Sequence, residues 1–383
     1  MHPSELDSAL ADLAQRSQLR KRTTLSSPQG VHIEIDGKPY LSFASNDYLG
    51  LANHPALIAA ARDSLLRWGL GSGASPLVTG HFEIHQQAEQ ALAAFVDRPA
   101  ALLFGSGYSA NLAVLGSFIG RGDAVFADRL NHASLNDGCR LSGARLCRFR
   151  HNDLDHLERL LQNTPARSRL IAVDAVYSMD GDEAPLQALL DLARRYDAWL
   201  YIDDAHGFGI LGQGHGSAVE FGLRDERVIY MATLGKAAGV SGAFVAGERA
   251  VIDWLINAGR TYIFSTAHPP ALAAAALASL QLIEAESWRR ERLGSSIDFC
   301  LRLISHRDTS LKASRTPIQP LIIGDNDRAL SGAEQLRQLG IWVPAIRPPT
   351  VAPGTSRLRI SLSAAHTPDD LQRLLLAIGT LAI

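Results

Sequence analysis

Short runs of apolar residues alternate with longer amphipathic stretches through the middle of the chain. The runs are apolar at every position, and they are Ala100–Phe104, Ala124–Ala127, Leu170–Val173, Trp199–Ile202, Val228–Met231 and Ala243–Ala246. Runs without alternation are typical of strands that are buried on both faces of a sheet. The segments between most of them, such as Leu186–Tyr196, have the apolar spacing of a helix. The pattern predicts an α/β fold with a mostly parallel sheet covered by helices.

The first seventy residues follow another pattern. Val31–Ile35 and Tyr40–Phe43 flank Asp36-Gly37, which predicts a hairpin with a tight turn. Ser4 is expected to cap a first helix, and Ala56–Trp68 has the composition of a second one.

The alternation resumes on a smaller scale after a long helical stretch over Ala271–Arg292. The strands expected there are Ile318–Ile323, Trp342–Ile346 and Leu358–Leu362, with helices near Arg328–Leu339 and Pro368–Ile378. We therefore expect an N-terminal arm of helix and hairpin over residues 1–50, a large domain over 51–285 and a small α+β domain over 286–383.

Charge and cysteine content narrow the class of protein. The chain has 37 basic and 39 acidic residues, a balance that gives no electrostatic footprint for nucleic acid or an anionic membrane. Cys139, Cys147 and Cys300 form neither a disulfide framework nor zinc-type spacing. The N-terminus is polar, and no apolar run reaches the ~18 residues of a membrane helix. We expect a cytoplasmic protein with no metal site, no nucleic-acid partner and no membrane contact.

The strongest candidate for chemistry is an aspartate and a lysine that follow neighbouring predicted strands. Asp203 comes directly after Trp199–Ile202, and Lys236 comes shortly after Val228–Met231 among small uncharged residues. A poorly solvated amine is nucleophilic, and a buried carboxylate calls for a cationic partner. Pyridoxal phosphate uses such a pair, with the lysine forming a Schiff base and the acid holding the pyridine nitrogen. The alternative is that Asp203 caps a helix and Lys236 is a surface lysine; only three other lysines exist, Lys21, Lys38 and Lys312.

A phosphate site is expected nearby. Gly105-Ser106-Gly107-Tyr108 follows the strand Ala100–Phe104 and opens a helix, an arrangement that binds anions, although a simple tight turn has the same sequence pattern. The Thr233 hydroxyl could bind the same phosphate. His132, after Ala124–Ala127, could stack on a planar cofactor, whereas a lone histidine is more often structural.

These residues belong to motifs that extend along nearly the whole chain. The motifs are Ser45-Asn46-Asp47-Tyr48-Leu49-Gly50-Leu51, Gly71-Ser72-Gly73, Gly105-Ser106-Gly107-Tyr108, Asn131-His132-Ala133-Ser134, Ser178-Met179-Asp180-Gly181-Asp182, the run from Asp203, the run ending at Lys236, Ile346-Arg347-Pro348-Pro349-Thr350-Val351 and Arg357-Leu358-Arg359. In these motifs the chain resembles the α-oxoamine synthases, which are fold-type I pyridoxal-phosphate enzymes of the aspartate aminotransferase superfamily. One departure is Asp174, which stands where the family often has glutamate.

The resemblance implies a role for each matched residue. Lys236 would carry the cofactor and act as acid and base at the α-carbon, Asp203 would bind the pyridine nitrogen, and His132 would stack over the ring. The cofactor-binding set would be Gly107, Tyr108, Ser178, Asp203, His206, Thr233 and Lys236. The substrate-binding set would be Arg20, Asn46, His132, Arg347 and Thr350, with Arg347 holding the substrate carboxylate and Lys21 and Arg22 as alternatives to Arg20.

The resemblance also implies substrates and partners. The chain is most similar to the member of the family that joins L-alanine to a pimeloyl thioester of coenzyme A or acyl carrier protein in biotin synthesis. The alternatives within the family are 2-amino-3-ketobutyrate ligase, 5-aminolevulinate synthase and serine palmitoyltransferase. The family usually builds its active centre at a homodimer interface, so we expect a dimer.

Two alternatives lie outside the family. A cofactor-free binding protein could retain the fold, but the presence of Asp203, His206 and Lys236 together argues against it. A nicotinamide dehydrogenase is disfavoured because no G-x-G-x-x-G follows the first strand of a βαβ unit.

Overall fold

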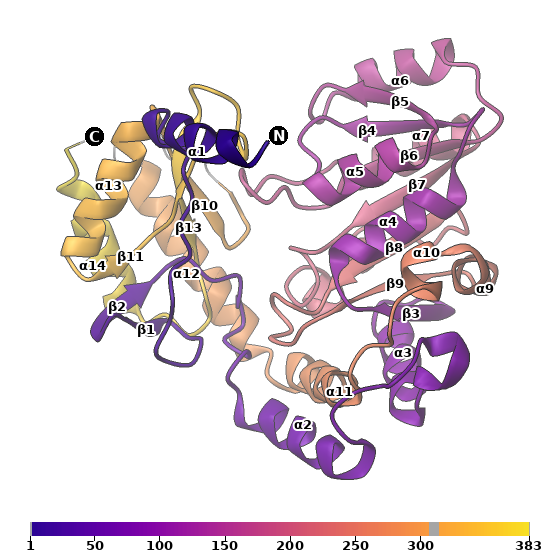
Figure 1. Cartoon of the computed structure of the whole chain (residues 1–383), viewed down its shortest axis with the longest axis horizontal. Helices are drawn as coiled ribbons and strands as arrows, with labels where there is room; N and C mark the ends of the chain where they lie inside the picture. Colours follow the sequence, from indigo (N-terminus) through magenta and orange to yellow (C-terminus); the bar gives the residue numbers. More distant parts are fainter. Residues whose placement is uncertain (1, 306–313, 383) are drawn as a thin grey trace. The chain divides into compact units, whose positions relative to one another are not determined.

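The computed structural model describes residues 2–305 and 314–382, which fold into two compact units (Figure 1). The larger unit contains Leu51–Ser178 and Asp182–Arg290. The smaller unit contains Met1–Gly50, Met179–Gly181 and Glu291–Ile383, so the N-terminal arm belongs with the C-terminal part of the chain. Lys312 lies outside the described residues.

A seven-stranded sheet forms the centre of the larger unit, with the order β3-β9-β8-β7-β6-β4-β5. Its strands are β3 (Ala100–Phe104), β4 (Ala124–Asp128), β5 (Arg145–Phe149), β6 (Arg169–Asp174), β7 (Ala198–Asp203), β8 (Val228–Thr233) and β9 (Ala243–Gly247). Only β9 runs antiparallel to its neighbours within this sheet. The predicted mostly parallel sheet is confirmed, and the carboxyl ends of the other six strands share one edge.

The helices of the larger unit pack on this sheet or on one another. They are α2 (Pro55–Trp68), α3 (Glu83–Phe95), α4 (Gly107–Phe118), α5 (Ala133–Leu141), α6 (Leu154–Asn163), α7 (Leu186–Arg195), α8 (Ser217–Glu220), α9 (Arg249–Ala258), α10 (Arg260–Ile263) and α11 (Pro270–Ala285), with short turns at Pro76–Gly80 and Gly212–Gly214. Helices α4 and α5 pack side by side (Figure 1). A Cβ on Gly138 of α5 would lie 2.7 Å from Leu115 Cδ1 of α4, so the glycine permits this close packing.

The smaller unit has two three-stranded sheets, β1-β2-β11 and β10-β13-β12. Its elements are a turn at Pro3–Glu5, α1 (Leu6–Gln15), β1 (His32–Ile35), β2 (Lys38–Ser42), β10 (Ile318–Gly324), α13 (Asn326–Gln338), β11 (Ile341–Trp342), β12 (Ala345–Ile346), β13 (Ser356–Ser361) and α14 (Pro368–Gly379), while α12 (Trp288–Ser305) begins in the larger unit. The β1–β2 hairpin is confirmed, and its turn residues Asp36 and Gly37 have φ angles of 51° and 70°.

Some predicted elements are wrong in detail. Ser4 lies inside the first turn, where its N–H donates to the His2 side chain, so it does not cap α1. Trp342–Ile346 is two short strands in different sheets rather than one. Ala271–Arg292 contains a break between α11 and α12. Among the described residues, no helix has both the length and the hydropathy needed to span a bilayer.

Candidate active site

A cavity of about 200 Å³ lies at the edge of the large sheet where the parallel strands end. Its lining includes eight of the predicted residues, namely Gly107, Tyr108, His132, Ser178, Asp203, His206, Thr233 and Lys236. They lie at or after the carboxyl ends of β3, β4, β6, β7 and β8, so the strand direction explains why residues far apart in the sequence converge.

Lys236 lies in the loop between β8 and β9. Its Nζ lies 3.0 Å from Nε2 of His206. The loop is held by backbone bonds from the N–H of Gly239 to the Lys236 carbonyl and from Val240 to Leu234, both 2.9 Å. Gly239 has φ +67°, and a Cβ there would lie 2.5 Å from the Leu51 carbonyl carbon. The loop therefore requires glycine at this position, and it fixes the base of the lysine side chain.

The two adjacent aspartates at the end of β7 have different surroundings. Asp203 lines the cavity, where its Oδ2 accepts from Asn111 Nδ2 at 2.8 Å and its Oδ1 from the Ala205 N–H at 3.1 Å. Asp204 instead accepts from Ser217 and from the Tyr230 hydroxyl. Complete burial raises the pKa of Asp204 to about 7. Asp203 is thus the carboxylate available for chemistry in the cavity, and Asp204 is a structural group.

A second carboxyl group, Asp174, lies opposite Asp203 at the end of β6. The two residues are register partners in the parallel ladder. Burial, and then the charge of Asp203, raises the pKa of Asp174 well above the usual range, while the His132 N–H donates to its Oδ2 at 2.9 Å. Its Oδ1 is buried with no hydrogen-bond partner in the described part of the chain. This oxygen marks a place in the cavity lining where a polar ligand group would be accommodated.

His132 is the N-cap of α5 and also lines the cavity. Its Nδ1 lies 2.7 Å from the Ser134 hydroxyl. Burial lowers the pKa of His132, so its ring is mostly neutral at pH 7. A neutral, flat ring at this place suits stacking on a planar group.

The N-terminus of α4 supplies an anion-binding end. Ser106 caps the helix by accepting from the Ser109 N–H, and Gly107 and Tyr108 begin the first turn. The first N–H groups of a helix have no partner inside it and attract negative charge. The Thr233 hydroxyl lies on the same cavity and donates to the Gly242 carbonyl at 2.9 Å. The Tyr108 hydroxyl donates to Asp137 Oδ2, which orients the ring.

Sequence reasoning did not assign several lining residues to the site. They are Asn111, Ser134, Asp174, Val176, Ala205 and Met231. Asn111 lies one helical turn after Gly107, and this spacing is the signal that could have indicated it.

Of the predicted substrate residues, His132 lines the cavity of the larger unit, whereas Arg20, Asn46, Arg347 and Thr350 lie in the smaller unit. Arg20 Nη2 donates to Thr350 Oγ1 at 2.9 Å, and Arg347 donates to the Ser17 carbonyl. Burial, and then the charge of Arg20, lowers the pKa of Arg347. Arg20, Thr350 and Arg347 therefore form one cationic group that a carboxylate would stabilise.

Asn46 has different neighbours within the smaller unit. Its Oδ1 accepts from Arg359 Nη1 and from the Tyr48 hydroxyl, both at 3.1 Å.

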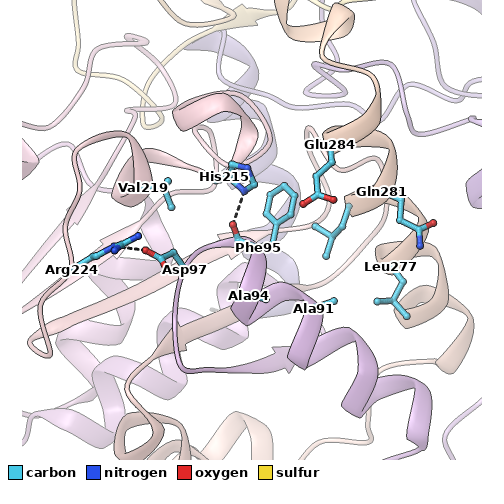
Figure 2. A pocket seen from close by; sticks show the side chains of 11 residues that line it. Ala91, Ala94, Phe95, Asp97, His215, Val219, Arg224, Leu277, Gln281 and Glu284 are labelled. Carbon is cyan, nitrogen blue, oxygen red and sulfur yellow. Dashed lines mark hydrogen bonds and ion pairs between the residues drawn. The ribbon is translucent and has the colours of Figure 1, made fainter.

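A second hollow of about 440 Å³ lies between α3, α11 and the segment around α8 (Figure 2). His215 Nδ1 bonds to the Phe95 carbonyl oxygen at 2.7 Å, and Arg224 pairs with Asp97 at 2.5 Å. The other residues that line this hollow include aliphatic side chains of α3, α8 and α11, and no described lysine is among them. The smaller cavity contains Lys236, Asp203 and His132, and it is therefore the candidate active site.

The aminotransferase class I and II family model matches residues 38–378. The chain belongs to this family. It is 62% identical over 375 residues to the 8-amino-7-oxononanoate synthase of Chromobacterium violaceum, a match that covers 98% of both chains. The family resemblance predicted from the motifs is confirmed.

Solved structures of the family have the same fold. A serine palmitoyltransferase from S. paucimobilis with a bound PLP–myriocin aldimine is similar with a TM-score of 0.92 and 29% identity, over 97% of this chain and 95% of that one. An 8-amino-7-oxononanoate synthase from Francisella tularensis is similar with a TM-score of 0.76 and 31% identity, over 88% of this chain and 96% of that one.

Proposed function

We propose that the protein is a pyridoxal-phosphate-dependent acyltransferase of biotin synthesis. It joins L-alanine to a pimeloyl thioester of coenzyme A or acyl carrier protein, and it forms 8-amino-7-oxononanoate, CO2 and the free thiol carrier. The observation that carries the proposal is the convergence of Lys236, Asp203 and the α4 N-terminus on one cavity, in a chain 62% identical to an 8-amino-7-oxononanoate synthase.

The groups around the cavity fit pyridoxal phosphate. An amine at Lys236 suits the aldehyde, a carboxylate at Asp203 suits the ring nitrogen, and the first turn of α4 suits the phosphate. The unpartnered Asp174 oxygen indicates that the lining accommodates a further polar group. When bound, the cofactor withdraws electrons from the α-carbon of the amino acid and so stabilises negative charge there.

Residues of the chain transfer or hold the protons at the α-carbon of alanine and at the ring nitrogen. Lys236 Nζ takes the proton from the α-carbon of alanine and later returns one, and His206 lies within hydrogen-bond distance of this amine. Asp203 keeps a proton on the ring nitrogen, because an anion next to that nitrogen favours its charged form. His132 would cover the ring as a neutral imidazole, and Gly107, Tyr108, Ser178 and Thr233 would complete the set of residues that hold the cofactor.

The substrate carboxylate is bound by Arg347. A guanidinium donates two parallel hydrogen bonds to a carboxylate, and the proximity of Arg20 favours an anion at this place. Arg20, Thr350 and Asn46 serve the acyl substrate. These roles follow the motif resemblance and the grouping of Arg20, Arg347 and Thr350.

The protein acts as a homodimer in the cytoplasm. The dimer is supported by large apolar side chains on α2, the following turn and the end of α10, of which Leu66 is 84% exposed and Phe264 71% exposed. The cytoplasm is supported by the three cysteines, which are buried free thiols.

The test is the identity of the product. The holoenzyme is incubated separately with alanine, glycine or serine and with pimeloyl-, acetyl-, succinyl- or palmitoyl-CoA, and products are identified by mass. Alanine with the pimeloyl thioester is expected to give 8-amino-7-oxononanoate. Faster turnover of another pair would assign the chain to a different reaction of the same family.

A further inference from the structure

Beneath the candidate cavity, buried polar side chains form one hydrogen-bonded network. The Tyr201 hydroxyl lies 2.6 Å from Asn111 Oδ1, and Asn111 Nδ2 lies 2.8 Å from both Asp203 Oδ2 and Ser134 Oγ. The Ser134 hydroxyl in turn lies 2.7 Å from His132 Nδ1. Tyr201, Asn111 and Ser134 are each at most 1% exposed. Water therefore does not replace these bonds.

The donors and acceptors of Asn111 determine how its amide is oriented. An ionised carboxylate only accepts hydrogen bonds, so the NH2 group must face Asp203. The amide oxygen then faces Tyr201, whose hydroxyl donates to it. Rotation of the amide by half a turn would place its oxygen against the Asp203 carboxylate. Tyr201 and Asp203 thus select the same orientation from opposite sides.

The same reasoning determines the proton on His132. Ser134 Oγ accepts from Asn111, so its own hydrogen is available for His132 Nδ1. The backbone N–H of Ser134 also points at this nitrogen, at 3.3 Å. A nitrogen that faces two donors acts as the acceptor, so the ring proton lies on Nε2.

We propose that Asn111 is a positioning residue that orients the Asp203 carboxylate directly and the His132 ring through Ser134, and that Tyr201 fixes the orientation of Asn111. The inference rests on the proposed function for the roles of Asp203 and His132. It adds that the acid that would bind the ring nitrogen and the imidazole that would cover the ring are held by one amide. A change at this amide then disturbs both groups together.

Two tyrosines on neighbouring strands offer a matched test. Tyr201 on β7 and Tyr230 on β8 are both fully buried, and each hydroxyl has a polar partner. Tyr201 contacts Asn111, whereas Tyr230 contacts Asp204 outside the network. Tyr201→Phe and Tyr230→Phe therefore remove the same atom from similar surroundings, and a general loss of stability affects both.

The first measurement uses nitrogen NMR of 15N-histidine-labelled protein without added cofactor, with the His132 signals assigned from a His132→Gln variant. The wild type and Tyr230→Phe are expected to show an unprotonated Nδ1 and a protonated Nε2 at His132. Tyr201→Phe and Asn111→Leu are expected to show a mixture of tautomers. Wild-type spectra in both variants would overturn the inference, and if Asn111→Leu does not fold, Tyr201→Phe alone decides.

The second measurement is catalysis by the holoenzyme. Asn111→Leu is expected to lose about 10²-fold in kcat/KM, as for a misplaced catalytic group. Tyr201→Phe is expected to lose about tenfold, as for one lost hydrogen bond. Equal losses in Tyr201→Phe and Tyr230→Phe would overturn the inference. If the wild type turns over no alanine, the proposed function fails, and the His132 tautomer still decides this inference.

Discussion

The Nζ of Lys236 lies 3.0 Å from Nε2 of His206, and the two residues follow neighbouring parallel strands of the large sheet. Three residues before His206, Asp203 points into the same cavity. Strand β7 therefore ends at the acid that we propose for the ring nitrogen and leads to the imidazole next to the amine, and β8 leads to the amine. This juxtaposition is the structural basis of the account.

Lys236→Ala is expected to abolish turnover and the visible absorbance of lysine-linked pyridoxal phosphate. The variant loses the acid and base, worth ~10²–10⁴-fold, and also the covalent anchor of the cofactor. Absorbance spectra and product formation measure the two effects. The control is Lys38→Ala, at an exposed position of β2. An unchanged spectrum in the Lys236 variant would remove this residue from the site.

Asp203→Asn and Asp204→Asn are expected to affect different properties. The first replaces the cavity carboxylate and should lower kcat by about 10²–10³-fold with a small effect on stability. The second leaves donors of Ser217 and Tyr230 poorly matched and should cost about 1–3 kcal/mol of unfolding free energy with little effect on kcat. Steady-state kinetics and urea unfolding separate these outcomes. Equal kinetic losses would contradict the distinct surroundings of the two side chains.

The stability of the larger unit is expected to fall between about pH 6.5 and 9 through His151. Burial lowers the pKa of His151, but the hydrogen bonds and charges of Asp128 and Asp182 raise it by more. The resulting pKa is about 9. The folded protein holds this proton more tightly than the unfolded chain, so the contribution is complete below the unfolded pKa and is lost as pH rises through 9. The contribution of His151 to the free energy of unfolding is up to about 3 kcal/mol.

The measurement is urea unfolding as a function of pH. His151→Gln should flatten the curve relative to the wild type, while His32→Gln, at an exposed position of β1, should leave it unchanged. Glu89 and Asp204 also titrate in this pH range, because burial raises the pKa of each to about 7. Their effect on stability is the same in the wild type and in the variants, so the difference between the curves reports on His151. The same pH slope in wild type and His151→Gln would refute the role of this histidine.

Arg347→Ala is expected to raise the KM for alanine by about 10²-fold, because a two-pronged contact to its carboxylate is lost. Arg347→Lys should recover only part of this loss, since an ammonium cannot form the planar pair. Arg328→Ala, at an exposed position of α13, serves as the control. An unchanged KM in Arg347→Ala would show that another group binds the carboxylate.

Much of the large sheet could be predicted from the sequence because its central strands are buried on both faces. Ala100–Phe104 has the same bounds as β3, since every residue of this strand is buried. The apolar pattern does not predict strand β5, because β5 lies at the sheet edge, where Arg145 and Arg148 are exposed and interrupt the apolar run. The apolar pattern of Trp342–Ile346 predicts one strand, whereas the structure has β11 and β12 in different sheets, because a local pattern does not reveal which sheet a residue joins.

The cavity residues at strand ends could be predicted for a similar reason. A polar residue directly after a buried strand, as at Asp203, is a local signal. The network beneath them could not be predicted, because Asn111 and Asp203 are 92 residues apart and only the packing of α4 on the sheet brings them together. The raised pKa of Asp174 also depends on the register of β6 and β7.

The central claim is tested most directly by mass analysis of the product that the purified holoenzyme forms from 13C-labelled L-alanine and pimeloyl-CoA. The account predicts 8-amino-7-oxononanoate that retains the α- and β-carbons of alanine, while the carboxyl carbon leaves as CO2. Release of free coenzyme A without a labelled amino-ketone, or an amino-ketone that retains the carboxyl carbon, would contradict it.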